Sequence, residues 1–185
     1  MTTSIEKRRH SANEHAVTPA HQSSPVDAQP GGVTAVGGQV AVIAVRAYTV
    51  ELYDGSSDKP RGGGAQSAGL GPSHIAIGPE DRLAITDTRG KALMVYDTRP
   101  KLRFRARVDL DGTPVGIAGD ARRGVVWVAL SERNRVVPVD LRGEKPKVGK
   151  AIDTVRNPFS LAVDPSSGRL AIASQADGTL QLVDP

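Results

Sequence analysis

The sequence lacks cysteine altogether, so it can form no disulfide, no thiolate metal site and no cysteine nucleophile. No apolar run approaches the ~18 residues that a membrane-spanning helix needs, and we expect no membrane span. Aromatic residues make up only 3% of the chain. This scarcity argues against binding of single-stranded nucleic acid, which relies on exposed aromatic rings.

Motifs of common enzymes are missing as well. The sequence has neither the Gly-x-Ser-x-Gly elbow of serine hydrolases nor a His-Glu-x-x-His zinc motif. The glycine run at residues 62–64 lacks the Lys-Ser/Thr pair of a phosphate loop. In the second glycine-rich stretch, which starts at Gly69, His74 stands where a dinucleotide fingerprint has its third glycine. We interpret both stretches as linkers, and we predict no catalytic residue, no cofactor and no metal ion.

Residues 1–30 are predicted to form a disordered tail. They are rich in Ser, Thr, His, Gln and Pro and have too few apolar residues to offset the entropy cost of ordering. His10, His15 and His21 are spaced five and six residues apart, which suits no compact pair of metal ligands on a helix. Basic residues 7–9 are followed by no apolar segment, so no secretory signal is visible. The sequence does not fix the compartment: the cytoplasm is expected if the chain starts here, and export if the true start lies upstream and carries a signal.

Residues 31–185 carry a repeat of about 43 residues. Equivalent segments end in an aspartate at intervals of 43, 43 and 44 residues, at Asp54, Asp97, Asp140 and Asp184. Repeats of this length are typical of architectures in which each unit packs against its neighbours. The predicted units are residues 31–70, 71–112, 113–156 and 157–185.

Within each unit, short apolar runs alternate with turns of Gly, Pro and Asp, a pattern that favours strands. A proline is expected to begin the first strand of each unit, at Pro30, Pro72, Pro114 and Pro158. The second strand is apolar on both faces, which predicts cover on both sides.

A fourth, outer strand is clearest at residues 102–110, where apolar and charged residues alternate and Phe104 is expected to face inward. Residues 147–153 are a weaker counterpart. The first unit shows little or no fourth strand, and the last stops after its third.

Four antiparallel strands per unit describe a β-propeller blade, so we predict an all-β propeller of about four blades. Three features recur: Pro-x-x-Ile/Leu-Ala, then a turn and an apolar strand, and a closing Val-x-Asp or Val-Asp. Together they resemble the YVTN-type repeat of bacterial propellers, the YncE-like and surface-layer-like group. The resemblance implies secretion or a place in the cell envelope if the true start is upstream.

Propellers of the group that the chain resembles usually have seven blades, whereas four are visible here. We therefore expect an open or incomplete ring, which would leave an apolar blade face and an unpaired strand edge exposed. Three alternatives remain. The chain is a closed ring of four blades, an arc that a second copy completes, or a truncated remnant of a longer propeller without independent function.

Loops on one rim of a propeller commonly bind partners, and we place the candidate partner contacts in the turns between second and third strands. These candidates are Asp87, Arg89, Arg133, Asn134, Gln175 and Asp177, and His74, ahead of the first strand's apolar run in its unit, is a seventh. The first hypothesis is a non-catalytic module that binds a protein or glycan-like partner there. The alternative for each side chain is plain exposure to solvent.

His74 is expected near the mouth of the central channel, where other units have Gly32, Gly116 and Ser160. A second hypothesis is therefore a hydrolase or lactonase that uses His74 and Asp87. The four periodic aspartates are interpreted as acceptors of backbone hydrogen bonds in turns, since Asp commonly fixes such turns.

Arginines alternate along the predicted outer strand at Arg103, Arg105 and Arg107. A duplex-binding protein needs an element that reads a groove, and a single-strand binder needs exposed aromatics beside its basic residues. We predict neither, and therefore no nucleic-acid partner. The arginines are interpreted as a solvated edge that discourages strand addition.

Overall fold

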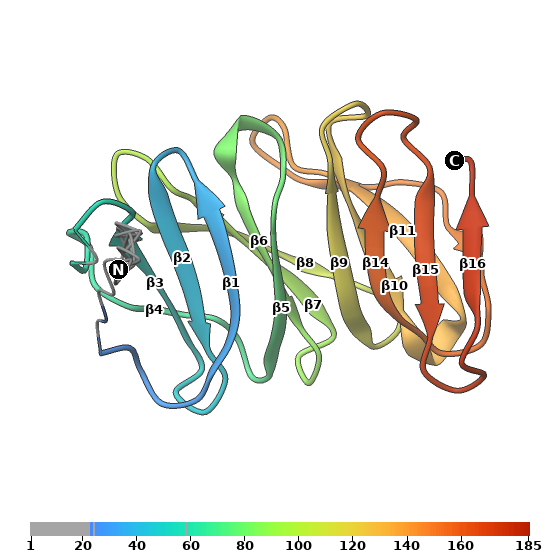
Figure 1. Cartoon of the computed structure of the whole chain (residues 1–185), viewed down its shortest axis with the longest axis horizontal. Helices are drawn as coiled ribbons and strands as arrows, with labels where there is room; N and C mark the ends of the chain where they lie inside the picture. Colours follow the sequence, from blue (N-terminus) through green and yellow to red (C-terminus); the bar gives the residue numbers. More distant parts are fainter. Residues whose placement is uncertain (1–22, 24, 58) are drawn as a thin grey trace, which may run out of the picture.

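The computed structural model describes residue 23 and residues 25–57 and 59–185. Its four antiparallel sheets stand side by side as blades in an open arc (Figure 1). The predicted all-β propeller of about four blades is therefore confirmed. Most of the predicted disordered tail, including His10, His15 and His21, lies outside the described residues.

The first two blades have four strands each. Blade 1 contains β1 (Pro30–Val36), β2 (Gln39–Ala44), β3 (Thr49–Asp54) and β4 (Gln66–Ser67). Blade 2 contains β5 (Pro72–Ile77), β6 (Leu83–Asp87), β7 (Ala92–Asp97) and β8 (Arg103–Asp109), with the 3₁₀ turn η1 (Pro79–Asp81) after β5.

The last two blades differ in their outer strands. Blade 3 contains β9 (Pro114–Asp120), β10 (Val125–Leu130), η2 (Ser131–Arg133), β11 (Arg135–Asp140), β12 (Lys147–Val148) and β13 (Ile152–Asp153). Blade 4 contains β14 (Pro158–Val163), β15 (Leu170–Ser174) and β16 (Leu180–Val183). A fourth strand is therefore absent from blade 4 within the described part of the chain, as the repeat pattern predicts.

Prolines mark the strand starts as expected, because Pro30, Pro72, Pro114 and Pro158 each begin the inner strand of a blade. Proline has no N–H group to contribute to a strand ladder, so the first position of a strand suits it. Pro138 lies inside β11, and the outer strand opposite it is split. β12 pairs with Val139 and Asp140, and β13 pairs with residues 135–136.

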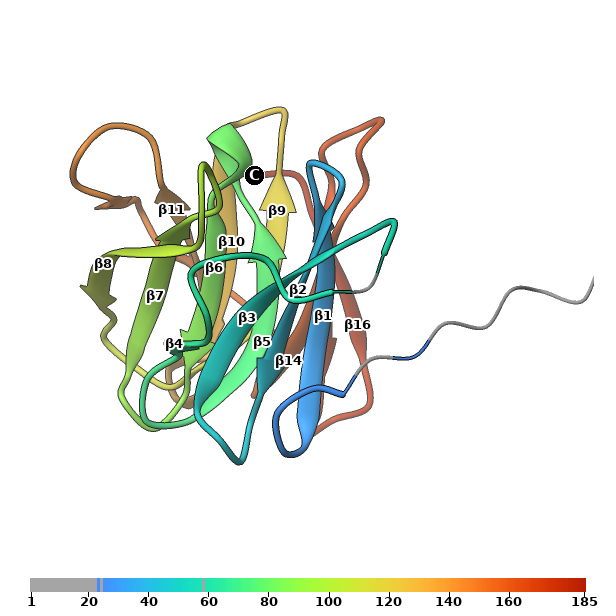
Figure 2. The ribbon, with the colours of Figure 1, turned by 90° about the vertical axis from the view of Figure 1, so that its left-hand side faces the viewer.

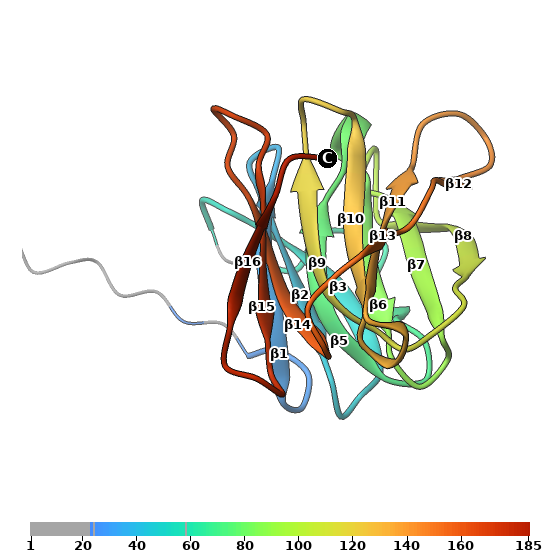
Figure 3. The same cartoon turned by 90° about the vertical axis from the view of Figure 1, so that its right-hand side faces the viewer.

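The inner strands β1, β5, β9 and β14 lie next to one another on one side of the arc, and the outer strands face away from them (Figures 2 and 3). Aliphatic side chains fill the spaces between successive blades. Between blades 1 and 2 the core includes Ile43, Leu52 and Ile85, and between blades 2 and 3 it includes Val95 and Val126. Burial of one such large side chain stabilises the fold by about 1.5–3 kcal/mol.

The second strand of an inner blade is covered on both faces, as its apolar pattern predicts. In β6, Leu83 and Ile85 pack toward blade 1, whereas Ala84 between them packs toward blade 3. At the end of the arc this cover is missing: Leu180 and Leu182 of β16 are 66% and 57% exposed. The arc is therefore well packed inside and apolar at its last blade.

The expectation that Phe104 faces inward is wrong, because its side chain is 45% exposed. The register of β7 with β8 shifts between Val95 and Tyr96, so that Phe104 stands opposite Tyr96 and Ala106 stands opposite Val95. The extra residue, Arg105, inverts the alternation at the start of β8. Phe104 packs edge-on against Tyr96, with ring centres 5.7 Å apart.

The periodic aspartates divide into two groups. Asp54 and Asp140 accept backbone N–H bonds in the turn that follows, from Ser56 at 2.9 Å and Arg142 at 2.9 Å, as predicted. The other two accept from arginine side chains, Asp97 from Arg103 of β8 and Asp184 from Arg169, which directly precedes β15. For these two, the ion pair replaces the predicted turn contact.

Candidate functional site

The arc has two rims, which we call rim A and rim B. Rim A carries the turns between second and third strands, at residues 45–48, 88–91, 131–134 and 175–179, together with the links between blades. Rim B carries the turns from first to second strands and the loops from third to fourth strands, including η1 and residues 55–65 and 98–102. Rim B lies at the top of Figure 1 and rim A at the bottom.

The predicted partner contacts lie on rim A, and five of the seven are exposed side chains: Arg89, Arg133, Asn134, Gln175 and Asp177. Each of the three turns that carry them belongs to a different blade. The structure thus spreads them along rim A from blade 2 to blade 4, and they do not converge on one pocket.

Polar contacts between blades hold these turns together. The guanidinium of Arg89 lies 3.4 Å from the Tyr48 hydroxyl of blade 1, and Lys91 pairs with Glu132 of blade 3 at 3.0 Å. The Asn134 side chain accepts the backbone N–H of Asn157, at the entrance to blade 4, at 2.8 Å. One such contact spans each junction, so polar contacts connect the turns of rim A from blade 1 to blade 4.

Asp87 is different, because its carboxylate is fully buried. It accepts backbone N–H bonds from Leu70 at 3.0 Å, Gly71 at 2.8 Å and Gly90 at 2.9 Å. The Asp87 carboxylate therefore binds both the link from blade 1, at residues 70–71, and the rim A turn of blade 2, at Gly90. A side chain enclosed in this way positions the rim and is not presented on it.

His74 lies in β5, with its ring half-buried against Phe159 of blade 4 at a centre distance of 5.8 Å. Its Nδ1 is buried and has no hydrogen-bond partner within the described residues. Burial lowers the pKa of His74 below its ordinary value of 6.5, and a hydrogen bond with the Val115 backbone opposes this shift. The ring is therefore neutral at pH 7 and packed between inner strands.

The arginines of the predicted outer strand are paired with acids. Arg103 and Arg105 both contact Asp97, at 2.8 and 3.2 Å, and Arg107 contacts Asp109 at 2.9 Å. The stripe is a row of ion pairs along the outer edge of blade 2, so its net positive potential is small.

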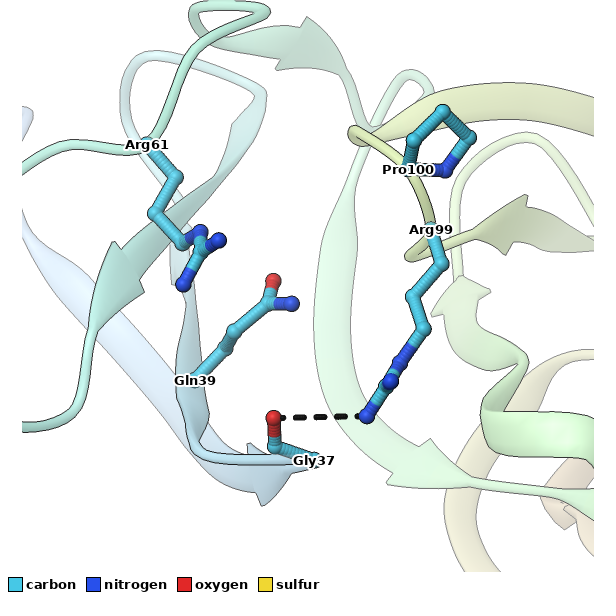
Figure 4. Close-up of a pocket in the computed structure, with 5 residues that line it drawn as sticks. All are labelled: Gly37, Gln39, Arg61, Arg99 and Pro100. Carbon is cyan, nitrogen blue, oxygen red and sulfur yellow. Dashed lines mark hydrogen bonds between the residues drawn. The ribbon is translucent and has the colours of Figure 1, made fainter.

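A groove on rim B was not predicted. It is a cavity of about 560 Å³ between blades 1 and 2, lined by Gly37, Gln39, Arg61, Arg99 and Pro100 (Figure 4). A neighbouring cavity of about 410 Å³ shares three of these residues and extends the groove to Leu52, Gly62, Gly63 and Lys101. Figure 4 shows the amide of Gln39 between the two arginine side chains.

The groove brings together two guanidinium groups, each with one acid nearby, and one acceptor that lacks a partner within the described residues. Arg61 pairs with Asp54 at 3.0 Å, and Arg99 lies 3.4 Å from the Gly37 carbonyl and 3.7 Å from Asp81. Gln39 is 6% exposed, and its Oε1 atom has no hydrogen-bond partner within the described residues.

Two signals in the sequence point to this groove in retrospect. Gln39 occupies the position of its repeat at which blades 2 and 4 have Arg82 and Arg169. The long glycine-rich loop before β4, which we interpreted as a linker, carries Arg61 to the groove. Neither signal is specific without the contact between the two blades.

Residues 25–57 and 59–185 contain no cluster of three or more His, Cys, Asp or Glu side chains that could hold a metal ion. A search of the same part of the chain finds no helix long and apolar enough to cross a bilayer.

No family model and no curated protein matches the sequence. Solved propellers do resemble the structure. One is the hydrazine synthase of Kuenenia stuttgartiensis, with a TM-score of 0.72, 17% identity and coverage of 89% of this chain and 49% of that one. Another, a mitotic checkpoint complex, has a TM-score of 0.71, 15% identity and coverage of 83% and 48%.

A third similar structure is virginiamycin B lyase from Staphylococcus aureus, at a TM-score of 0.62 and 15% identity, with coverage of 83% of this chain and 54% of that one. At such identities the likeness shows the propeller fold alone. The chain spans about half the length of these solved chains. They include both a checkpoint assembly and enzymes, so the fold does not decide between binding and catalysis.

Proposed function

We propose that the chain is a non-catalytic propeller module that binds a protein or glycan-like partner through rim A. The observation that carries this proposal is the set of contacts between blades, from Tyr48 with Arg89 to Asn134 with Asn157. They hold exposed side chains on a surface that is ordered before any partner arrives.

Such order favours binding, because a rigid surface loses less conformational entropy when a partner docks. Arginine is also frequent among the residues that dominate binding energy at interfaces. Arg89 and Arg133 lie exposed on neighbouring turns of rim A, and Gln175 continues the surface on blade 4.

The test is a triple variant, Arg89→Ala with Arg133→Ala and Gln175→Ala. A glycan array and a displayed peptide library identify ligands of the unaltered protein, and we expect the variant to lose those ligands while its circular dichroism stays the same. Arg103→Ala with Lys145→Ala removes the same charge away from rim A and serves as the control. Ligands that survive the triple variant would remove rim A from consideration.

The hydrolase hypothesis has less support from the site. The carboxylate of Asp87 is occupied by three backbone N–H groups, and the ring of His74 packs on Phe159. A general base must reach the proton that it abstracts, directly or through one water. A panel of lactones and esters distinguishes the hypotheses, since turnover that His74→Phe abolishes would favour the enzyme.

For assembly, we propose that a second copy of the chain covers the last blade. The exposed Leu180 and Leu182 support this, as does the outer edge of β16, which pairs with no strand of the described residues, because apolar faces and open edges favour association. Two chains together also have about the length of one solved propeller.

Leu180→Glu with Leu182→Glu is expected to convert dimers to monomers in light scattering. Leu70→Glu, at another exposed leucine, is the control, and a monomeric unaltered protein would contradict the proposal.

A further inference from the structure

We propose that the groove on rim B is a binding site for a small sugar acid, meaning a monosaccharide-sized ligand that carries both a carboxylate and hydroxyl groups. The site lies between blades 1 and 2 on the rim opposite the proposed partner surface. It is therefore independent of the function proposed for rim A.

The carboxylate is indicated by two guanidinium groups that approach the groove from different blades. Arg61 comes from the loop after β3 and Arg99 from the turn after β7 (Figure 4). A guanidinium has five N–H donors in a planar fork that matches a carboxylate. The contact of Arg99 with Asp81 is long, at 3.7 Å, so that guanidinium can turn toward a bound anion without breaking a short ion pair.

The hydroxyl is indicated by Gln39. Its Oε1 is buried, has no partner within the described residues, and belongs to a side chain that lines both cavities. Buried acceptors are nearly always paired, so this oxygen calls for a donor. A carboxylate offers only acceptors, whereas a hydroxyl can donate. If the amide is turned around, its N–H₂ group requires an acceptor instead, and a hydroxyl also meets that need.

Size and shape agree with a sugar ring. The cavity of about 560 Å³ falls within the range of ~300–1,000 Å³ that is usual for small-molecule sites. Pro100 lines both cavities and is exposed, so that the groove has apolar surface beside its charged groups. The C–H face of a sugar can lie on such surface while its acid group faces the arginines.

A bound anion would compete with the Asp54 carboxylate for the guanidinium of Arg61. Its carboxylate accepts from the Arg61 guanidinium and also from the backbone and side chains of Ser56 and Ser57. Asp54→Asn keeps an oxygen for the turn but removes the negative charge beside Arg61. This variant should therefore increase the affinity for an anion, which a role of Asp54 in stability alone would not do.

The test is isothermal titration calorimetry of the full chain with sodium glucuronate and galacturonate. Glucose lacks the carboxylate, acetate lacks the hydroxyl, and inorganic phosphate tests for a general anion site. We expect saturable binding of at least one sugar acid and none of glucose or acetate. Arg99→Ala should weaken the binding of the sugar acid about tenfold, which corresponds to the loss of roughly one charge-assisted hydrogen bond. Asp54→Asn should strengthen the binding of the sugar acid.

Two further variants complete the design. Gln39→Leu should weaken the sugar acid and leave any binding of phosphate unchanged, because it removes only the partner of the hydroxyl. Arg122→Ala, an exposed arginine elsewhere on rim B, should have no effect. The proposal is overturned if neither sugar acid binds, if phosphate binds as well as they do, or if folded Arg99→Ala binds like the unaltered chain.

Discussion

The two rims of the arc join their blades by different chemistry. On rim A, charged side chains of opposite sign meet, as in Lys91 with Glu132 and Arg156 with Asp177. On rim B, arginines donate to backbone carbonyl oxygens of the next blade, as in Arg82 with Leu141, Arg105 with Gly143 and Arg122 with Ser166. Two of these arginines also meet carboxylates of their own blade, since Arg82 contacts Glu80 and Asp97 and Arg105 contacts Asp97. The rim B arginines therefore use a carbonyl oxygen, and not an acid, to reach the next blade.

This difference assigns the rims to different kinds of ligand. A surface whose turns already bond to one another, such as rim A, gains specificity from shape and from a few exposed side chains. A groove with arginines that are only partly neutralised, such as that of rim B, attracts a small anion. The comparison leads to four predictions, from the largest expected effect to the smallest.

The largest effect is expected at the buried carboxylate behind rim A. Asp87→Ala removes three hydrogen bonds and leaves three backbone N–H groups without their acceptor, so it should lower the free energy of unfolding by about 3 kcal/mol. Urea denaturation measures the change. Asp111→Ala, at an exposed ion pair with Arg133, is the matched control and should cost under about 1 kcal/mol. Equal losses would contradict the role of Asp87.

A smaller loss is expected on rim B at Arg82, whose guanidinium donates to the Leu141 carbonyl and contacts Glu80 and Asp97. Arg82→Met should cost about 2 kcal/mol in urea denaturation, because a nearly buried acceptor loses a charged donor. The cost should change little with salt, since a carbonyl has no charge to screen. A strong dependence on salt would show that the two acids dominate instead.

The exposed pair of Lys91 and Glu132 on rim A should contribute less, under about 1 kcal/mol. Salt screens such pairs, so the difference between Lys91→Ala and the unaltered protein should shrink in ~1 M NaCl. Thermal unfolding at low and high salt measures it. A difference that persists in high salt would mean that packing of the lysine stem, not charge, joins blades 2 and 3.

The smallest effect concerns Asp54 beside the groove. Hydrogen bonds from Ser56 and Ser57 lower the pKa of its carboxyl from 3.8 to about 2. Because the folded pKa is the lower one, the contribution to stability is present above pH 3.8 and is lost as the pH falls through about 2. Ser56→Ala with Ser57→Ala should move the pKa back toward 3.8, as NMR of the carboxyl carbon can show. If the pKa of Asp54 does not move in this variant, the ion pair with Arg61 lowers it instead.

Much of the fold was predictable from the sequence, because the signals for it are local. Strand-opening prolines such as Pro72, and aliphatic columns such as Leu83 and Ile85, depend on residues near one another in the chain. The orientation of Phe104 was not predictable, because the bulge that turns it arises from the pairing of β8 with β7.

The candidate site was predictable only in part. The turns of rim A could be placed from the repeat, and the exposed Arg89 and Arg133 are where the pattern put them. The burial of Asp87 was missed, because its partners Leu70 and Gly71 come from the link before the blade. The groove was missed for a similar reason, since Gln39 and Arg99 lie 60 residues apart in the sequence.

By itself the sequence determined that this protein is a row of four equivalent β-sheets, since periodic burial of aliphatic side chains favours the same sheet in each repeat. Only the tertiary structure decided which charged groups meet between blades, and that Arg61 and Arg99 come together in one groove. The physical reason is that side-chain pairing depends on the distance and angle between blades, which no local pattern of residues encodes.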